Sequence, residues 1–328
     1  MSYSDAVLVT GAGGFIGSHL VERLVRDGAR VRAFVHYNSR NDWGLLELLP
    51  QEVLKELEVI TGDIQDPFSV GGAVRGCRTV FHLSSLIAIP YSYVAPQSYV
   101  MTNVLGATNV LQAAREHGVD RVVHTSTSEC YGTAQYVPID EQHPLQGQSP
   151  YSASKIGADM IAESYWRSFN LPVAIIRPFN TFGPRQSARA VIPTIITQAL
   201  SGSDVRLGSL APTRDLNYVG DVVDAFVRVG QSADAVGRVL NIGSGREISV
   251  GELAKLILKL IKSKAKIISE EQRIRPENSE VERLLCNADQ ARKLLGWQPG
   301  VSLEEGLERT IEWVRANLSR YKTALYNV

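Results

Sequence analysis

A tyrosine and a lysine four residues apart are the most chemically informative pair in the chain. Tyr151 and Lys155 follow Pro150 and open a segment that is predicted to be helical to about residue 168. At this spacing the two side chains project from one face of a helix. A nearby ammonium favours the phenolate and should lower the pKa of Tyr151 from its ordinary value near 10. The pair is therefore suited to removing a proton from an alcohol.

A second polar group follows a predicted strand at 121–125. It contains Thr127, Ser128 and Glu129. Polar residues at the carboxyl end of a central strand lie where doubly wound folds bind ligands. Thr127 can hold a substrate oxygen opposite Tyr151. A carboxylate is not needed for simple hydride transfer, so Glu129 is either a second catalytic group or a loop glutamate that points to water.

A glycine-rich loop lies between a predicted strand at 6–10 and a predicted helix at 18–27. Gly11, Gly14 and Gly17 permit a tight turn, close approach of the backbone to a pyrophosphate, and close helix–strand packing. The helix N-terminus, with Phe15 and Ile16, supplies N–H donors to the anion. Because the motif follows a strand and opens a helix, it predicts dinucleotide binding rather than an ordinary turn.

The loop after the second predicted strand bears on the choice between NAD and NADP. An acidic residue there would bind the ribose 2′-hydroxyl, but none occurs before Asp42. The polar residues of this loop are His36, Asn38, Ser39 and Arg40. They favour NADP if Arg40 binds a 2′-phosphate, whereas Arg40 can equally be a solvated loop arginine. Asp63 can receive the adenine amino group or be an ordinary surface carboxylate.

Short β-rich runs alternate with amphipathic stretches in the first half of the chain. The predicted strands are 6–10, 31–35, 57–60, 79–83, 121–125 and 173–176, and the predicted helices are 18–27, 98–117 and 151–168. Apolar strands separated by helices predict a doubly wound parallel (Rossmann) sheet of the α/β class. After Pro178, glycine and proline become frequent and the predicted helices are 191–201, 250–263 and 303–318. We therefore expect a Rossmann domain over 1–178 and a smaller mixed substrate domain over 179–328, interleaved because a strand near 239–242 rejoins the main sheet.

The composition excludes several other functions. The 328 residues are 44% hydrophobic and 21% charged, which is typical of a globular chain. Lys+Arg and Asp+Glu are both 34, so the basic footprint of a nucleic-acid binder is lacking. No apolar run approaches the ~18 residues that span a bilayer, and no signal peptide is recognisable, so we expect a cytoplasmic protein without a membrane partner. The three cysteines are far apart and no cluster has metal-ligand spacing, so we expect free thiols and no metal.

Together these motifs resemble the extended short-chain dehydrogenase/reductase family of NAD(P)-dependent sugar-nucleotide epimerases and dehydratases. Residues 82–85, Asn103, 177–180 and 214–219 also match the family. Thr127-Ser128-Glu129 resembles the 4,6-dehydratases, especially the GDP-mannose type. It departs from the Thr-Asp-Glu of dTDP-glucose dehydratases, so a separate aspartic acid donor is missing. Residues 87–93, 149–159 and 177–197 resemble NDP-N-acetylglucosamine 4,6-dehydratases of the legionaminic-acid type.

The resemblance implies a set of site residues. The implied catalytic residues are Thr127, Ser128, Glu129, Tyr151 and Lys155. The implied cofactor contacts are Gly11, Gly14, Phe15, Ile16, Gly17, His36, Asn38, Ser39, Arg40, Asp63, Ile64, Leu83, Ser84, Ser85, Tyr151, Lys155 and Pro178. The implied substrate contacts are Ile87, Asn180, Arg185, Arg214 and Arg275, with the arginines as ligands of the diphosphate. A homodimer through the helices at 98–117 and 151–168 is also implied, although their apolar stripes can instead face their own sheet.

The implied reaction converts an NDP-hexose to its 4-keto-6-deoxy form. Tyr151 removes the 4-hydroxyl proton while hydride passes from C4 to NAD(P)⁺. Glu129 removes the C5 proton, water leaves from C6, and the hydride returns to C6. The proton for the departing hydroxyl comes from Ser128, a bound water or Glu129. Because the cofactor ends as it began, we expect it to stay tightly bound and to be recycled.

Three other functions stay open at this point. UDP-glucuronate decarboxylases share Thr-Ser-Glu before the Tyr-Lys pair, and 4-epimerases share the first step. A decarboxylase or a uronate epimerase must hold the C6 carboxylate of its substrate, so it needs a cationic or donor-rich pocket near C6. A dinucleotide-sensing protein without catalysis is less favoured, because Tyr151, Lys155 and Glu129 are all present.

Overall fold

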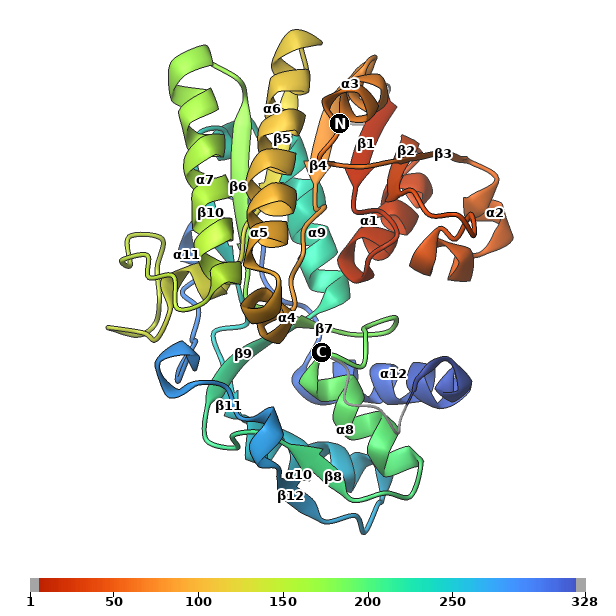
Figure 1. The fold of residues 1–328 in the computed structure, drawn as a ribbon, viewed down its shortest axis with the longest axis vertical. Coiled ribbons are helices and arrows are strands. Elements are labelled where there is room, and N and C mark those ends of the chain that lie inside the picture. The colour runs from red at the N-terminus through yellow and green to blue at the C-terminus, as the bar shows by residue number, and fades with distance from the viewer. Residues whose placement is uncertain (1–5, 323–328) are drawn as a thin grey trace.

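The computed structural model describes residues 6–322, and a parallel seven-stranded sheet dominates it (Figure 1). The strand order is β10-β6-β5-β4-β1-β2-β3, and every neighbouring pair is parallel. The strands are β1 (Ala6–Thr10), β2 (Arg30–His36), β3 (Leu57–Gly62), β4 (Cys77–His82), β5 (Arg121–Thr125), β6 (Val173–Pro178) and β10 (Val239–Ile242). This order, with its reversal between β1 and β4, confirms the predicted doubly wound α/β fold.

Helices cover both faces of this sheet, as Figure 1 shows. One face packs against α3 (Pro67–Val74), α6 (Gly106–Glu116) and α7 (Pro150–Phe169), and the other against α1 (Phe15–Arg26), α9 (Val219–Gln231) and α11 (Asp289–Leu295). Because both faces are buried, the strands need apolar side chains in both directions. All five residues of β1 are accordingly buried.

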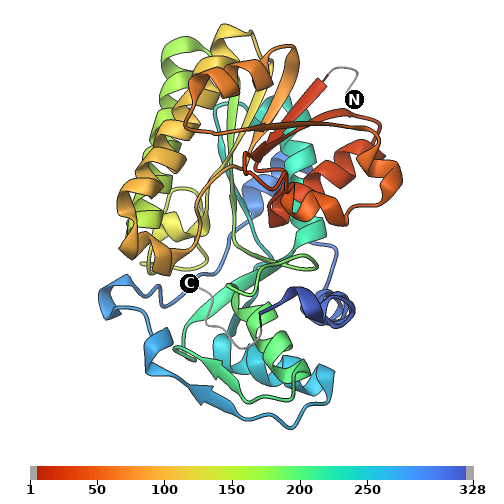
Figure 2. The same ribbon diagram turned by 45° about the vertical axis from the view of Figure 1, so that its right-hand side comes forward.

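The second lobe contains two small sheets and three helices (Figure 2). Its strands are β7 (Asn180–Phe182), β9 (Thr213–Tyr218) and β11 (Glu247–Ser249) in one sheet, and β8 (Val205–Leu207) and β12 (Ile267–Ser269) in the other. Its helices are α8 (Val191–Leu200), α10 (Val250–Ile261) and α12 (Leu303–Ala316), which share a separate core. Since α9, β10 and α11 pack with the main sheet although they follow Pro178, we propose an interleaved domain division rather than a single boundary.

The helix predicted over 98–117 is divided into three segments. It consists of α5 (Pro96–Tyr99), a π-helical segment over Val100–Leu105, and α6. Asn103 is buried in the π segment, and its amide donates to Leu86 O and Ser154 Oγ and accepts from Leu86 N. These contacts tie the π segment to α7 and to the loop after β4, and such bulges often mark functional sites.

Local signals in the sequence fix the start of α7. Ser149 caps its N-terminus in a capping box with Ser152, and Pro150 occupies the first turn. Tyr151 is consequently the second residue of the helix. Two further short helices of the Rossmann lobe are α2 (Gln51–Leu54) and α4 (Ile89–Val94).

No helix in the part of the chain that the structure describes has the length and apolar character to cross a bilayer. Cys77, Cys130 and Cys286 are all free and buried.

The packing of α9 on the sheet predicts a large stability loss for Phe226→Ala. Phe226 is fully buried, and its ring lies 6.5 Å from that of Phe81 on β4. Loss of a buried phenylalanine ring typically lowers the free energy of unfolding by about 3–5 kcal/mol. Phe68→Ala is the matched control because Phe68 on α3 is 87% exposed, and we expect it to cost less than about 0.5 kcal/mol. Urea denaturation measures both, and similar losses for the two variants would contradict this packing.

Candidate active site

One large cleft lies at the carboxyl ends of the central strands and reaches into the second lobe. Its volume is about 1280 Å³. Loops after β1, β4 and β5 form one wall, and residues from β7, α8 and β9 form the other. The cleft is therefore located where doubly wound folds bind ligands.

The five predicted catalytic residues all line this cleft. Thr127 follows β5, and the 3₁₀ turn over Ser128–Tyr131 carries Ser128 and Glu129. Thr127 Oγ1 accepts from the Glu129 backbone N–H at 3.3 Å. The exposed fractions are 2% for Ser128, 9% for Glu129 and 7% for Tyr151. Glu129 thus lies on the cleft wall and does not point to bulk water.

The expected lowering of the Tyr151 pKa is not found in the protein itself. Burial raises the pKa of Tyr151 above its usual value, an interaction with the Thr127 side chain opposes this rise, and the Glu129 carboxylate adds to it. Lys155 Nζ donates to Thr125 O at 2.6 Å. Burial also lowers the pKa of Lys155, whereas the Asp159 carboxylate raises it. Desolvation is therefore the largest influence on Tyr151 and keeps it a neutral phenol.

The glycine loop has the shape of a diphosphate cradle. Gly11 has a φ of +69°, and a Cβ at this position would lie 2.8 Å from Ser84 N. A Cβ on Gly17 would lie 2.2 Å from Gly11 O. Helix α1 begins after Gly14 without a side-chain cap, so its first N–H groups face the cleft unshielded. These features fit the pyrophosphate of a dinucleotide.

Most of the predicted cofactor contacts line the cleft. They are Gly11, Gly14, Phe15, Ile16, Gly17, His36, Asn38, Arg40, Ile64, Leu83, Ser84, Ser85, Tyr151, Lys155 and Pro178. Ser39 and Asp63 are not among its lining residues. Ser39 is exposed, and Asp63 Oδ1 accepts from Gln65 N at 2.9 Å within its own turn. Arg40 lies 3.7 Å from Asp42, and its side chain is 83% exposed.

Four of the five predicted substrate contacts also line the cleft. They are Ile87, Asn180, Arg214 and Arg275. Arg214 and Arg275 share one oxygen of Glu280, at 3.2 and 3.4 Å. Asn180 Oδ1 is buried without a hydrogen-bond partner in the structure. An unpaired buried acceptor is costly, so Asn180 is poised to accept a bond from a ligand.

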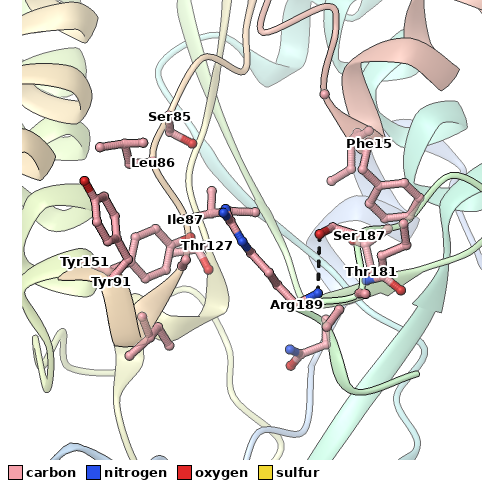
Figure 3. Close-up of a pocket in the computed structure, with 18 of the residues that line it drawn as sticks. Phe15, Ser85, Leu86, Ile87, Tyr91, Thr127, Tyr151, Thr181, Ser187 and Arg189 are labelled. Carbon is pink, nitrogen blue, oxygen red and sulfur yellow. Dashed lines mark hydrogen bonds between the residues drawn. The ribbon is translucent and has the colours of Figure 1, made fainter. Parts of the chain in front are cut away.

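The fifth predicted substrate residue, Arg185, is not brought to the cleft. Its guanidinium donates to Glu22 Oε2 at 2.6 Å and to His19 Nδ1 at 2.7 Å, and the residue is 8% exposed. Sequence alone did not reveal this, because Glu22 and His19 are more than 160 positions away. Arg189 lines the cleft instead, and Figure 3 shows it extending into the pocket together with Ile87 and Thr127.

A buried polar network lies beneath the catalytic residues. Asp159, one turn after Lys155 on α7, pairs with Arg177 of β6 at 2.9 Å. His124 Nε2 lies 3.2 Å from Asp159 Oδ1. Although burial acts in the opposite direction, the His124 hydrogen bond and the Arg177 charge lower the pKa of Asp159 to about 2. Within residues 6–322, no cluster of acidic, cysteine or histidine side chains is arranged to hold a metal ion.

Comparison with known proteins places the chain among enzymes that act on sugar nucleotides. A family model described as GDP-mannose 4,6 dehydratase matches residues 8–310. The mouse dTDP-D-glucose 4,6-dehydratase is 33% identical over 98% of this chain and 92% of its own length. A UDP-glucose 4-epimerase of Mycolicibacterium smegmatis is 35% identical over 94% of this chain and 98% of its own. UDP-glucuronic acid decarboxylase 1 of Xenopus tropicalis is 31% identical over 98% and 74%.

Solved structures show the same architecture. Epimerase Mth375 of Methanothermobacter thermautotrophicus superposes with a TM-score of 0.90 at 30% identity, over 98% of this chain and 96% of that one. The dTDP-glucose 4,6-dehydratase DesIV of Streptomyces venezuelae, solved with NAD bound, gives 0.85 at 29% identity over 97% and 99%. The full-length coverage means that both lobes, and not the Rossmann sheet alone, are shared.

The buried ion pair predicts a pH-dependent stability loss for Asp159→Asn. Removing this carboxylate leaves Arg177 charged and unpaired, which typically costs about 3–5 kcal/mol. A folded-state pKa of about 2 lies below the ordinary value, so the carboxylate stabilises the fold above about pH 4 and loses this effect as pH falls towards 2. Denaturation at pH 7 and pH 3 should therefore show that Asp159→Asn lowers the free energy of unfolding less at pH 3 than at pH 7. The control is Asp120→Asn, which breaks an exposed pair with Arg78 and should cost under about 1 kcal/mol; equal losses would contradict the prediction.

Proposed function

This chain belongs to the extended short-chain dehydrogenase/reductase family of NAD-dependent sugar-nucleotide dehydratases and epimerases, and from that premise we propose that it is a 4,6-dehydratase. The proposed substrate is an NDP-hexose, in particular an NDP-N-acetylglucosamine, and the proposed product is its 4-keto-6-deoxy form. One observation carries the proposal: the Glu129 carboxylate, 9% exposed, lines the same cleft wall as Tyr151, and its charge adds to the rise in the pKa of that phenol. A buried acid beside the phenol has no task in simple alcohol oxidation.

We propose NAD as the resident cofactor rather than NADP, which the loop after β2 favours only if Arg40 binds a 2′-phosphate. The support is that related structures are described with NAD bound and that the Arg40 side chain is turned largely to solvent. The glycine loop and the start of α1 would hold the diphosphate, with Ser84 and Lys155 further along the cleft. When bound, the oxidised dinucleotide supplies the hydride acceptor for C4 and, once reduced, the hydride donor for C6. Its positive ring would also offset the desolvation that keeps Tyr151 neutral.

Tyr151 and Thr127 would act on the 4-hydroxyl. Thr127 Oγ1 holds the sugar oxygen, and the phenolate of Tyr151 takes its proton. When protonated, Lys155, which lies one turn along α7 and donates to Thr125 O, would stabilise the phenolate. The C4 carbonyl that results acidifies the hydrogen on C5.

Glu129 would then remove the C5 proton and promote loss of the C6 hydroxyl. The hydroxyl needs one proton to leave as water, and Glu129 carries the proton that it has just accepted. Transfer from Glu129, directly or through the buried hydroxyl of Ser128, balances this step without the aspartic acid that other dehydratases have. When C6 is reduced, Glu129 delivers to C5 a proton taken up from solvent, and Tyr151 releases the 4-hydroxyl proton to solvent, so the two protons removed are matched by two returned.

The other end of the substrate would bind in the second lobe. Arg214 and Arg275 can hold the diphosphate through charge-assisted hydrogen bonds, with Glu280 as their counter-ion between turnovers. Asn180 has an unpaired acceptor on the same path. A homodimer through α6 and α7 also remains a proposal, and exposed Met101 and Met160 on this side of the molecule support it.

A second candidate is UDP-glucuronate decarboxylation, and Arg189 is the observation that favours it. This arginine lines the cleft, points into it in Figure 3, and is exposed. It could therefore bind a C6 carboxylate. Arg185, the other arginine of this loop, is held by Glu22 outside the cleft and cannot do so in this conformation. The 4-epimerases share the Tyr151 step but leave Glu129 without a task.

A product assay separates these candidates. The purified protein is incubated separately with UDP-N-acetylglucosamine, GDP-N-acetylglucosamine and UDP-glucuronate, and the products are analysed by mass spectrometry. We expect loss of water from an N-acetylglucosamine donor without net formation of NADH. Loss of carbon dioxide from the glucuronate would instead establish the decarboxylase, and an unchanged mass with a new stereoisomer the epimerase.

The variant Glu129→Gln tests the proposed base. It retains the shape of the side chain but cannot accept the C5 proton, so we expect water loss to fall by at least about 10²-fold, as for removal of a general base. Transient reduction of the cofactor, followed at 340 nm, should persist because Tyr151 is intact. Glu141→Gln is the control, because this half-buried glutamate contacts Asn241 and Gln290 away from the cleft. Dehydration at the parent rate by Glu129→Gln would refute its role.

A further inference from the structure

We infer that the buried Asp159–Arg177 pair is a positioning device that fixes Glu129 relative to Tyr151, with Ser126 and Tyr131 as its two links to the catalytic turn. The inference rests on the proposed function only for the task of Glu129. The geometry of the links is independent of the substrate.

The first link holds the start of the catalytic segment. Ser126 Oγ donates to Asp159 Oδ2 at 2.5 Å, and Arg177 Nε donates to Ser126 Oγ at 3.3 Å. Ser126 is 5% exposed and immediately precedes Thr127. Both members of the ion pair therefore contact the same hydroxyl at the point where β5 ends.

The second link holds the end of the same segment. Arg177 Nη1 donates to the Tyr131 hydroxyl at 3.0 Å, and that hydroxyl donates to Asn241 Oδ1 at 2.7 Å. The Tyr131 side chain is fully buried. Ser126 and Tyr131 flank Thr127, Ser128 and Glu129, so one guanidinium contacts the residues on both sides of the catalytic segment.

The same pair is rigidly related to Tyr151 through α7. Tyr151, Lys155 and Asp159 are spaced by four residues and share one face of the helix. Asp159 also accepts from His124 on β5, which joins the helix to the strand that ends at the catalytic segment. The position of Glu129 relative to Tyr151 is thus set by a short chain of buried contacts between α7, β5 and β6.

The charge arrangement suits a positioning role better than a purely stabilising one. Asp159 is fully buried and Arg177 is 2% exposed, and a buried ion pair by itself adds little stability over apolar packing. What it provides is directional bonding, since the planar guanidinium donates at fixed angles to Asp159, Ser126 and Tyr131 at once. A 1 Å displacement of a catalytic group can lower the rate about 10²-fold, so the loss of one Arg177 hydrogen bond should measurably slow the step that depends on Glu129.

Two mild variants test the inference without breaking the ion pair. Tyr131→Phe and Ser126→Ala each remove one link and leave Asp159 bonded to Arg177. Their matched controls are Tyr136→Phe and Ser164→Ala, which remove hydroxyls that bond to Asp140 and to Ile161 O outside the network. Hydrogen–deuterium exchange is measured on the substrate-free protein. In a second experiment, the reduction and reoxidation of the cofactor are followed at 340 nm during a single turnover of the sugar nucleotide from which the wild-type protein releases water.

Positioning predicts a selective effect in both measurements. Amides of residues 127–132 should exchange at least about threefold faster in the two link variants, whereas those of α7 should be unchanged. The step that depends on Glu129 should slow by about tenfold, as expected for a misplaced catalytic group, while the Tyr151-dependent reduction of the cofactor stays within about twofold. The reduced cofactor should therefore accumulate.

Two results would overturn the inference. One is exchange over 127–132 that matches the controls, and the other is equal slowing of both kinetic steps, which indicates general damage to the fold. If the wild-type protein releases no water from any donor, the proposed dehydratase fails, and the exchange measurement alone decides whether the pair positions the catalytic segment.

Discussion

The active site depends on three groups that share one face of α7 and are almost completely withdrawn from water: Tyr151, Lys155 and Asp159. Burial opposes the charge of each, raising the pKa of the phenol and lowering that of the ammonium. The Asp159 carboxylate, one turn away, opposes the lowering of the Lys155 pKa, and contacts from His124 and Arg177 keep the pKa of Asp159 itself low. The reactive groups that line the cleft therefore depend on Asp159 and Arg177, which do not line it.

The cleft-lining arginines of the second lobe are less deeply buried than Lys155 and Asp159 on α7. The chain has no net charge, so an anionic ligand must be met by local concentrations of arginine. Arg214 and Arg275 share the Glu280 carboxylate and remain partly accessible in the cleft. A resident counter-ion limits their repulsion, whereas a diphosphate would offer several acceptors at once. The cleft thus combines buried catalytic residues on the Rossmann sheet with partly exposed arginines on the opposite wall.

The sequence predicted those features whose physical cause is local. The glycine loop, the start of α7 and the strands of the main sheet were recognised because each depends on residues within a few positions of one another. Features that depend on distant partners were not recognised. The bond of Arg185 to Glu22 crosses 163 positions, and it removes a predicted ligand from the cleft. The π segment around Asn103 and the neutral state of Tyr151 likewise arise from contacts that only the folded chain creates.

The central claim is that Glu129 and Tyr151 act on adjacent carbons of one sugar, and the fate of the hydrogen on C4 tests it most directly. A donor sugar nucleotide that carries deuterium at C4 would be converted in ordinary water, an unlabelled donor would be converted separately in deuterated water, and the label in each product would be located by NMR. The predicted results are migration of the C4 deuterium to C6 in the first product and solvent deuterium at C5 in the second. Retention of the deuterium at C4 in the first product, with no solvent deuterium at C5 in the second, would contradict the proposed dehydration.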